Sequence, residues 1–167
     1  SYCAPSRSSF LSGRRPDTTR CWEFEDHIRE PGVGLDWRSL PEYFKVVGGY
    51  ASLGSGKCWH PGLPPNDDWP RSWSKEFPYF PTPVSGPYHC VESAGGGGGR
   101  GVTYCAANTS KHDVVLTDQK ITRSCIEQMK AGSETGKPFF VGCGLHRPHV
   151  PWVFPEEFLS GLPSVED

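Results

Sequence analysis

The chain has 167 residues, of which 35% are hydrophobic, and a length of this kind supports one hydrophobic core and excludes two large domains. Its net charge of -2 and pI near 6.3 exclude a general electrostatic attraction to polyanions, so we predict no nucleic-acid partner and only local anion binding. No apolar run approaches the roughly 20 residues needed to cross a bilayer, which predicts no membrane span.

The ends of the sequence indicate a piece of a longer protein. The chain begins at Ser1, its single methionine is Met129, and its last residues follow a Pro-rich stretch without an element that would close a fold. We therefore expect more protein on both sides.

The first predicted element is a short helix that begins near Cys3. Pro5 suits the first helical turn, and Gly13 suits the position just past the last one. Cys3 then lies at or just before the helix N-terminus, where backbone N–H groups and the helix dipole favour an anion. Arg7 lies one turn further on, so both side chains can face the same cavity.

A second helix and a strand are predicted in the next segment. A capping-box pattern from Ser39 to Glu42 predicts a short amphipathic helix that ends at residues 48–49. Residues 50–53 are typical of a short strand. Lys57 and His60 lie on the loop after it, three positions apart, where they can present a charge and a titratable ring to one ligand.

Residues 61–112 form a predicted irregular insertion, because Pro, Gly and aromatic residues occur there without a sustained period. Asp67 and Asp68 superficially resemble a metal-binding pair, but their neighbours predict a turn. The glycines at 95–99 lack the strand and helix of a phosphate-binding loop and indicate a flexible loop.

The seven cysteines are an odd number, which favours an oxidising compartment and leaves at least one unpaired sulfur, for which Cys3 is the candidate. Cys90 and Cys105 flank the glycine run, where a disulfide would restrain a segment that cannot organise itself by burial. Asn108 begins a glycosylation sequon. We predict the Cys90–Cys105 disulfide, glycosylation at Asn108 and a secretory-pathway protein.

A helix is predicted from Thr117 and Asp118, with a stop at Gly132. Its expected apolar face consists of Ile121, Cys125, Ile126 and Met129. Residues 139–145 then form an apolar run typical of a buried strand. His146 and His149 follow its end, and in an open α/β sheet this is the edge where ligand sites gather.

The segment around Cys3 resembles a known family. Cys3-Ala4-Pro5-Ser6-Arg7, followed by Leu11-Ser12-Gly13-Arg14, matches the extended signature of the formylglycine-dependent sulfatases, C-x-P-S-R with a following L-x-G-R. Further counterparts occur in the same order at residues 13–20, 40–45, 56–62 and 144–151. These matches are most similar to the branch that acts on 2-sulfated iduronate.

The resemblance implies an α/β fold of the alkaline-phosphatase type with a mixed central sheet, present here as a fragment: residues 1–167 would be a partial catalytic domain. It implies that Cys3 is converted to formylglycine by a formylglycine-generating enzyme. One hydroxyl of the aldehyde hydrate would attack sulfur, and the other would later expel sulfate.

The resemblance also implies roles for four further residues. Arg7 and Lys57 would hold the hydrate and the sulfate, and His60 would bind the hydrate or act as a base. His149 would contact the sulfate near the leaving oxygen, so Lys57 and His149 are the expected substrate-binding pair. His146 competes with His149 for this role.

The implied metal is Ca²⁺, with Mg²⁺ as an alternative, and of these residues only Cys3, as formylglycine, would ligate it. A hard divalent ion takes about six oxygen ligands, and the family's acidic ligands have no counterparts in this sequence. We therefore expect the isolated fragment to be inactive. The expected location is lysosomal or extracellular, or periplasmic in a bacterium.

The expected substrate is a sulfated carbohydrate, such as the iduronate 2-sulfate groups of heparan or dermatan sulfate. Two other functions stay open: a phosphoester hydrolase of the same superfamily, and an inactive protein that binds sulfated carbohydrate. The second would use tryptophans as sugar-stacking surfaces, although core packing explains most of them equally well. The tryptophans concerned are Trp22, Trp59, Trp69, Trp73 and Trp152.

Overall fold

The computed structural model describes residues 2–62, 65–83, 90–94, 104–109 and 114–163. The chain forms two compact units, each made of two segments. Unit 1 comprises Ser1–Thr82 and Ile121–Leu145, and unit 2 comprises Pro83–Lys120 and His146–Asp167. The glycine run at 95–99, interpreted as a flexible loop, lies outside the described residues.

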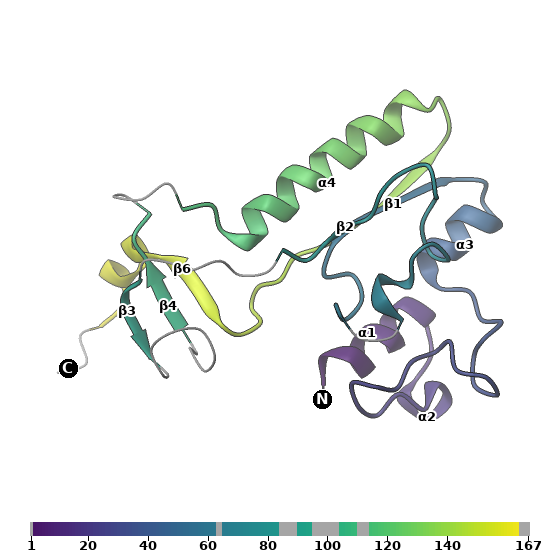
Figure 1. Ribbon diagram of the computed structural model, residues 1–167, viewed down its shortest axis with the longest axis horizontal. Helices are drawn as coiled ribbons and strands as arrows, with labels where there is room; N and C mark the ends of the chain where they lie inside the picture. The colour runs from purple at the N-terminus through teal and green to yellow at the C-terminus, as the bar shows by residue number, and fades with distance from the viewer. Residues whose placement is uncertain (1, 63–64, 84–89, 95–103, 110–113, 164–167) are drawn as a thin grey trace. The chain divides into compact units, whose positions relative to one another are not determined.

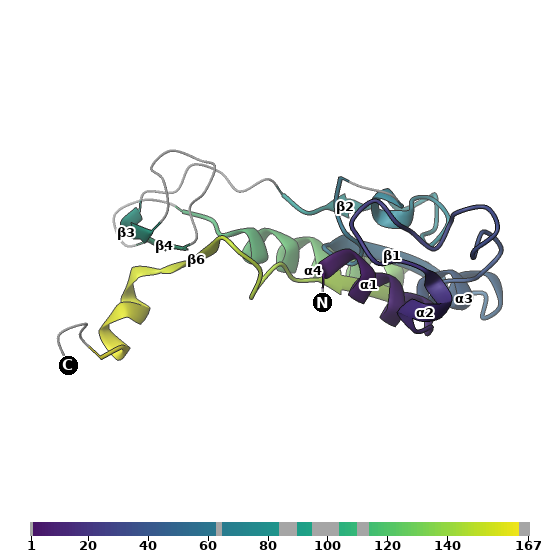
Figure 2. The same ribbon diagram turned by 90° about the horizontal axis from the view of Figure 1, so that it is seen from below.

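The first helix and the start of the third lie where the sequence indicates, whereas the third helix ends before the predicted residues 48–49 and the second was not predicted. Helix α1 spans Cys3–Ser12 and ends at Gly13, whose φ of 66° is left-handed. The short α2 spans Pro16–Thr19, and α3 spans Leu40–Val46. The predicted capping box is present, since the Ser39 hydroxyl accepts from the Glu42 N–H at 3.2 Å and the Glu42 carboxylate accepts from the Ser39 N–H at 3.3 Å. Both views show α1, α2 and α3 gathered together (Figures 1 and 2).

Unit 1 contains a three-stranded sheet in the order β2-β1-β5, and both strand pairs are parallel. Strand β1 spans Ala51–Gly56, β2 spans Phe80–Pro81 and β5 spans Phe139–Gly144. The register runs from Ala51 opposite Phe139 to Gly56 opposite Gly144. The carboxyl ends of β1 and β5 therefore meet at one edge of the sheet.

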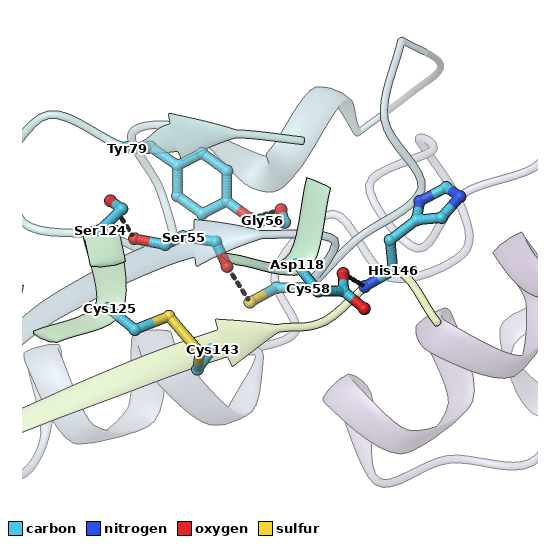
Figure 3. The surroundings of a disulfide bond; sticks show 9 residues. All are labelled: Ser55, Gly56, Cys58, Tyr79, Asp118, Ser124, Cys125, Cys143 and His146. Carbon is cyan, nitrogen blue, oxygen red and sulfur yellow. Dashed lines mark hydrogen bonds between the residues drawn. A yellow bond between two sulfur atoms is a disulfide. The ribbon is translucent and has the colours of Figure 1, made fainter. Parts of the chain in front are cut away.

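Alternation along the strands directs side chains to helices on opposite faces. Helix α4, Thr117–Glu134, lies on one face: Ser124 shares a hydrogen bond of 2.9 Å with Ser55 of β1, and Cys125 forms a disulfide with Cys143 of β5 (Figure 3). On the other face, the ring of Phe140 stacks on Phe44 of α3 with a centroid distance of 4.8 Å. The sheet thus lies between α4 and α3 (Figure 1).

The core of unit 1 lies on the α3 side of the sheet. Its buried residues are Leu11, Cys21, Ile28, Cys58, Trp59 and Trp73. Trp59 and Trp73 are each only 1% exposed, so the core interpretation holds for these two tryptophans, whereas Trp22, Trp69 and Trp152 are exposed.

A buried cluster of ion pairs connects the segments around Arg29, Glu42 and Asp68 in unit 1. Arg29 donates to both carboxylate oxygens of Asp68, at 3.0 and 2.7 Å, and to Glu42 at 2.7 Å. Asp68 ends the 3₁₀ turn η1, Asn66–Asp68, in which all three residues have positive φ. Asp67 and Asp68 thus form the predicted turn, and Asp68 binds a guanidinium.

Unit 2 contains a second three-stranded sheet in the order β3-β4-β6 (Figure 2). Strands β3, Cys90–Ala94, and β4, Tyr104–Ala107, are antiparallel, whereas β6, Trp152–Pro155, runs parallel to β4. The predicted Cys90–Cys105 disulfide joins β3 to β4. The second 3₁₀ element, η2, spans Glu156–Gly161.

The α/β class is confirmed, but the described sheet of unit 1 is parallel, and mixed pairing occurs in unit 2. Within the described residues, no helix has the length and apolar character of a bilayer span.

Three details of the α4 and β5 predictions are wrong: the end of α4, its buried face and the burial of β5. Helix α4 continues past Gly132 to Glu134, and Ile126 and Met129 are 47% and 48% exposed. Ile126 lies about 140° around the helix from the buried Ile121, which removes it from the buried face. Strand β5, expected to be buried, is largely half-exposed because it is an edge strand in the described sheet, with β1 as its partner.

Candidate active site

Cys3 is the first residue of α1 and is half-buried. The residue before it, Tyr2, has extended backbone and provides no side-chain cap, so the first-turn N–H groups of α1 are not satisfied by a cap. Arg7, one turn along, donates from Nε to the Cys3 Sγ at 3.1 Å. The predicted proximity of Cys3 and Arg7 is therefore present.

The guanidinium of Arg7 is fixed by the loop that follows β1. Its Nη1 donates to the backbone carbonyl oxygens of Lys57 and Cys58, the latter at 3.2 Å. These bonds connect α1 to the carboxyl edge of the sheet, although Arg7 and Lys57 are 50 positions apart. The arrangement leaves a cation oriented toward residue 3.

Lys57 follows β1 directly and is only 2% exposed. Burial is the main cause that lowers the pKa of its ammonium, and the nearby charge of Arg7 acts in the same direction. Cys3 acts oppositely, through its charge and a hydrogen bond with Lys57. Two cations, Arg7 and Lys57, thus converge on one sulfur.

Two glycines permit this close approach of the strand ends. Gly56 has a φ of 75°, and a Cβ there would overlap the carbonyl oxygen of Gly144. A Cβ on Gly144 would overlap the carbonyl carbon of Lys57 and the amide nitrogen of Cys58. The backbone at the sheet edge is therefore packed without room for side chains.

A cavity of about 350 Å³ adjoins these groups. Arg7 and Lys57 contribute its cationic side chains, and much of the remaining lining is apolar, including Phe10, Leu40, Trp73 and Phe140. Charge inside an apolar lining is screened less than charge on an open surface.

His60 reaches this region through aromatic contacts. Its ring centroid lies 5.0 Å from that of Phe24, and Phe24 lies 5.3 Å from Tyr2, the neighbour of Cys3. His60 is half-buried. The structure therefore associates His60 with the start of α1 by ring packing.

His149 belongs to unit 2 and is exposed. Its Nδ1 lies 2.6 Å from the carbonyl oxygen of Val150, and its ring centroid lies 5.1 Å from that of His146. The structure thus brings Cys3, Arg7 and Lys57 together in unit 1, and describes His149 within the other unit.

Two features of the site were not predicted. Tyr79 donates its hydroxyl to the carbonyl oxygen of Gly56 at 2.6 Å, and burial raises the pKa of its phenol. The Cys125–Cys143 disulfide ties α4 to β5 one residue before Gly144 (Figure 3). The odd cysteine count allowed this bridge without specifying it, and no sequence pattern marks Tyr79.

The described residues alone do not fit a calcium site. Among them, no group of three or more histidine, cysteine, aspartate or glutamate side chains is arranged to hold a metal ion. Cys3, as formylglycine, remains the expected contribution of this sequence to the metal.

No family model matches the chain. Sequence comparison nevertheless finds similarity to proteins named as sulfatases over 96% of the chain, in agreement with the signature at Cys3. Among these relatives, iduronate 2-sulfatase of Mus musculus and that of Homo sapiens are each 37% identical over 166 residues. A sulfatase of Formosa agariphila is 32% identical over 170 residues. The chain spans 29% of the length of the first two relatives and 32% of the third.

Proposed function

We propose that this chain carries part of the catalytic centre of a sulfatase, in which Cys3 is converted to formylglycine and its hydrate attacks the sulfur of a sulfate ester. The observation that supports this most directly is the convergence of Arg7 and Lys57 on residue 3 at the start of α1. Homology to sulfatases over 96% of the chain supports the same reaction.

The reaction proceeds in two steps. As the bond between sulfur and the ester oxygen breaks, one hydroxyl of the hydrate releases its proton to water and its oxygen forms a bond to sulfur, while His149 supplies the proton that the departing alcohol takes up. His60 then removes the proton of the second hydroxyl. The aldehyde reforms as the bond between its carbon and the sulfate oxygen breaks, sulfate leaves, and water restores the hydrate.

Arg7 and Lys57 stabilise the negative charge of the sulfate. Both cations are held before substrate arrives, Arg7 by two backbone carbonyls and Lys57 by burial at the strand end. Groups fixed in this way require little reorganisation as charge develops in the transition state. The start of α1 adds partial positive charge from its backbone N–H groups.

We assign no step of this reaction to calcium, because the described residues do not by themselves form a site for the ion. We expect its carboxylate ligands to come from other parts of the full-length protein, and the isolated fragment to be inactive for that reason.

We further propose a sulfated sugar as substrate, with the 2-sulfate of iduronate in heparan or dermatan sulfate as the first compound to test. The names of the mouse and human relatives support this choice. Two disulfides support passage through the secretory pathway and a lysosomal or extracellular location, and the sequon at Asn108 fits such a location.

The test compares turnover of matched substrates by the full-length protein made in cells with a formylglycine-generating enzyme. The panel is 4-methylumbelliferyl sulfate, 4-methylumbelliferyl phosphate and a disaccharide with 2-sulfated iduronate. We expect sulfate release that disappears in Cys3→Ala. Preferential cleavage of the phosphate ester, or binding of the disaccharide without turnover, would overturn the proposal in favour of a phosphoester hydrolase or an inactive carbohydrate-binding protein, respectively.

A further inference from the structure

Asp118 lies in the first turn of α4, and its carboxylate accepts hydrogen bonds from residues outside that helix. An acidic residue at such a position ordinarily serves its own helix, through the N-terminal N–H groups and the dipole. Here one carboxylate oxygen accepts from the backbone N–H of His146 at 2.7 Å, and the other accepts from the N–H of Arg147 at 3.1 Å. Figure 3 shows the Asp118 carboxylate directed at the His146 backbone.

The segment held by Asp118 is the turn that carries His149. The N–H of His149 donates to the carbonyl of His146 at 3.0 Å, so the residue fixed by Asp118 is also the residue on which the turn closes. Further along, the Trp152 indole donates to the Pro148 carbonyl at 2.7 Å. The turn is therefore anchored on both sides of His149.

The same turn determines which nitrogen of His149 carries a proton. Its Nδ1 lies 2.6 Å from the carbonyl oxygen of Val150, and because a carbonyl oxygen accepts only, Nδ1 must be the donor. In the neutral ring Nε2 is then the nitrogen without a hydrogen, so proton exchange with a leaving oxygen would use Nε2. A hydrogen bond that fixes the ring tautomer in this way also fixes the ring orientation.

We propose that Asp118 is the positioning residue for His149: by accepting both backbone N–H groups at the start of the turn, it holds the imidazole with Nε2 free for proton transfer. This inference rests on the proposed function, in which His149 protonates the leaving alcohol. Hydrogen bonds from backbone N–H groups to an ionised carboxylate are among the stronger ones, which suits a residue that fixes a turn.

The test is a double-mutant cycle in the full-length protein, with rates normalised to formylglycine content. Asp118→Ala should lower kcat for 4-methylumbelliferyl sulfate by about tenfold or more while KM changes less than about threefold. In a His149→Ala background, the same substitution should lower kcat by less than about twofold, because its effect acts through the missing imidazole. Asp118→Asn, which keeps one acceptor oxygen, should lie between wild type and Asp118→Ala.

Asp17→Ala is the matched control, because Asp17 is also an acidic residue in the first turn of a helix but is exposed on α2. It should leave kcat unchanged. An unchanged kcat in Asp118→Ala, or an equal loss with and without His149, would overturn the positioning role. An unchanged kcat in His149→Ala would contradict the catalytic role of His149 and therefore the positioning role of Asp118. If sulfate release still depended on Cys3 in that case, the sulfatase proposal would stand.

Discussion

The backbone N–H of Lys57 donates to the carbonyl oxygen of Gly144 at 2.6 Å. This bond joins the residue after β1 to the last residue of β5, so the cation at the sheet edge is held by the neighbouring strand. Because Arg7 donates to the Lys57 carbonyl, the same peptide segment also orients the second cation. The geometry around Cys3 thus depends on close contact between two strand ends.

Gly144→Ala should disrupt this contact. The added Cβ would overlap the backbone of Lys57 and Cys58, and we expect a loss of about 1–3 kcal/mol in unfolding free energy, together with a lower kcat. Chemical denaturation and sulfate release measure the two effects. Gly161→Ala is the control, since no atom lies within 4 Å of a Cβ there. Equal stability of the two variants would contradict this explanation of Gly144.

Lys57→Ala should reduce kcat for a sulfate ester by about 100-fold or more, the range found when one preorganised charge-stabilising group is removed. Lys137→Ala, at an exposed lysine, should have no effect. Because burial lowers the pKa of Lys57, its cation is lost at a lower pH than that of an ordinary lysine. The alkaline decline of kcat should therefore begin below the ordinary lysine value of about 10.4. A pH-rate profile unchanged in Lys57→Ala would contradict this assignment.

Arg29→Ala should be among the most destabilising single substitutions in unit 1. It leaves the buried carboxylate of Asp68 without a guanidinium and removes one of the two that pair with Glu42, which costs about 3–5 kcal/mol. Arg71 pairs with Glu42 from a half-exposed position, so Arg71→Ala should cost about 1 kcal/mol or less. Urea denaturation of the two variants checks the order, and a larger loss in Arg71→Ala would contradict it.

Asp67→Asn should stabilise the protein at neutral pH. Burial raises the pKa of Asp67 to about 6 from 3.8, so between these values the folded state binds more protons than the unfolded state. Its contribution to stability is therefore fully present below about pH 4 and is lost as pH rises through about 6. Asn also suits the left-handed φ of 60° at this position.

The expected gain in the free energy of unfolding of Asp67→Asn is roughly 1 kcal/mol at pH 7 and close to zero at pH 4. The gain at pH 7 is smaller than the full pKa shift of Asp67 would give, because solvent screens its carboxylate. Thermal unfolding at both pH values measures it. Asp68→Asn is the adjacent control and should destabilise the protein, because Asp68 holds Arg29 through two hydrogen bonds. A gain of equal size at pH 4 and pH 7 would contradict the titration of Asp67.

Local signals predicted much of the chain, because each depends on residues close together in sequence. The cap at Ser39 and the left-handed stop at Gly13 are examples, and both occur as expected. The proximity of Cys3 and Arg7 followed from helical spacing. These features need no knowledge of the rest of the fold.

Contacts between segments that are far apart in the sequence were harder to predict. Nothing local indicates that Tyr79 binds the Gly56 carbonyl or that Cys125 pairs with Cys143. The extent of β5 burial likewise depends on which strands lie beside it. Such features arise from packing between elements, which periodicity within one element does not encode.

The mass of the tryptic peptide that contains residue 3 tests the central claim most directly. In full-length protein made with a formylglycine-generating enzyme, we expect a peptide about 18 Da lighter than the cysteine form, which marks an aldehyde in place of the thiol. The fraction of this peptide should rise and fall with the rate of sulfate release. An intact cysteine at position 3 in protein that releases sulfate at full rate would contradict the account.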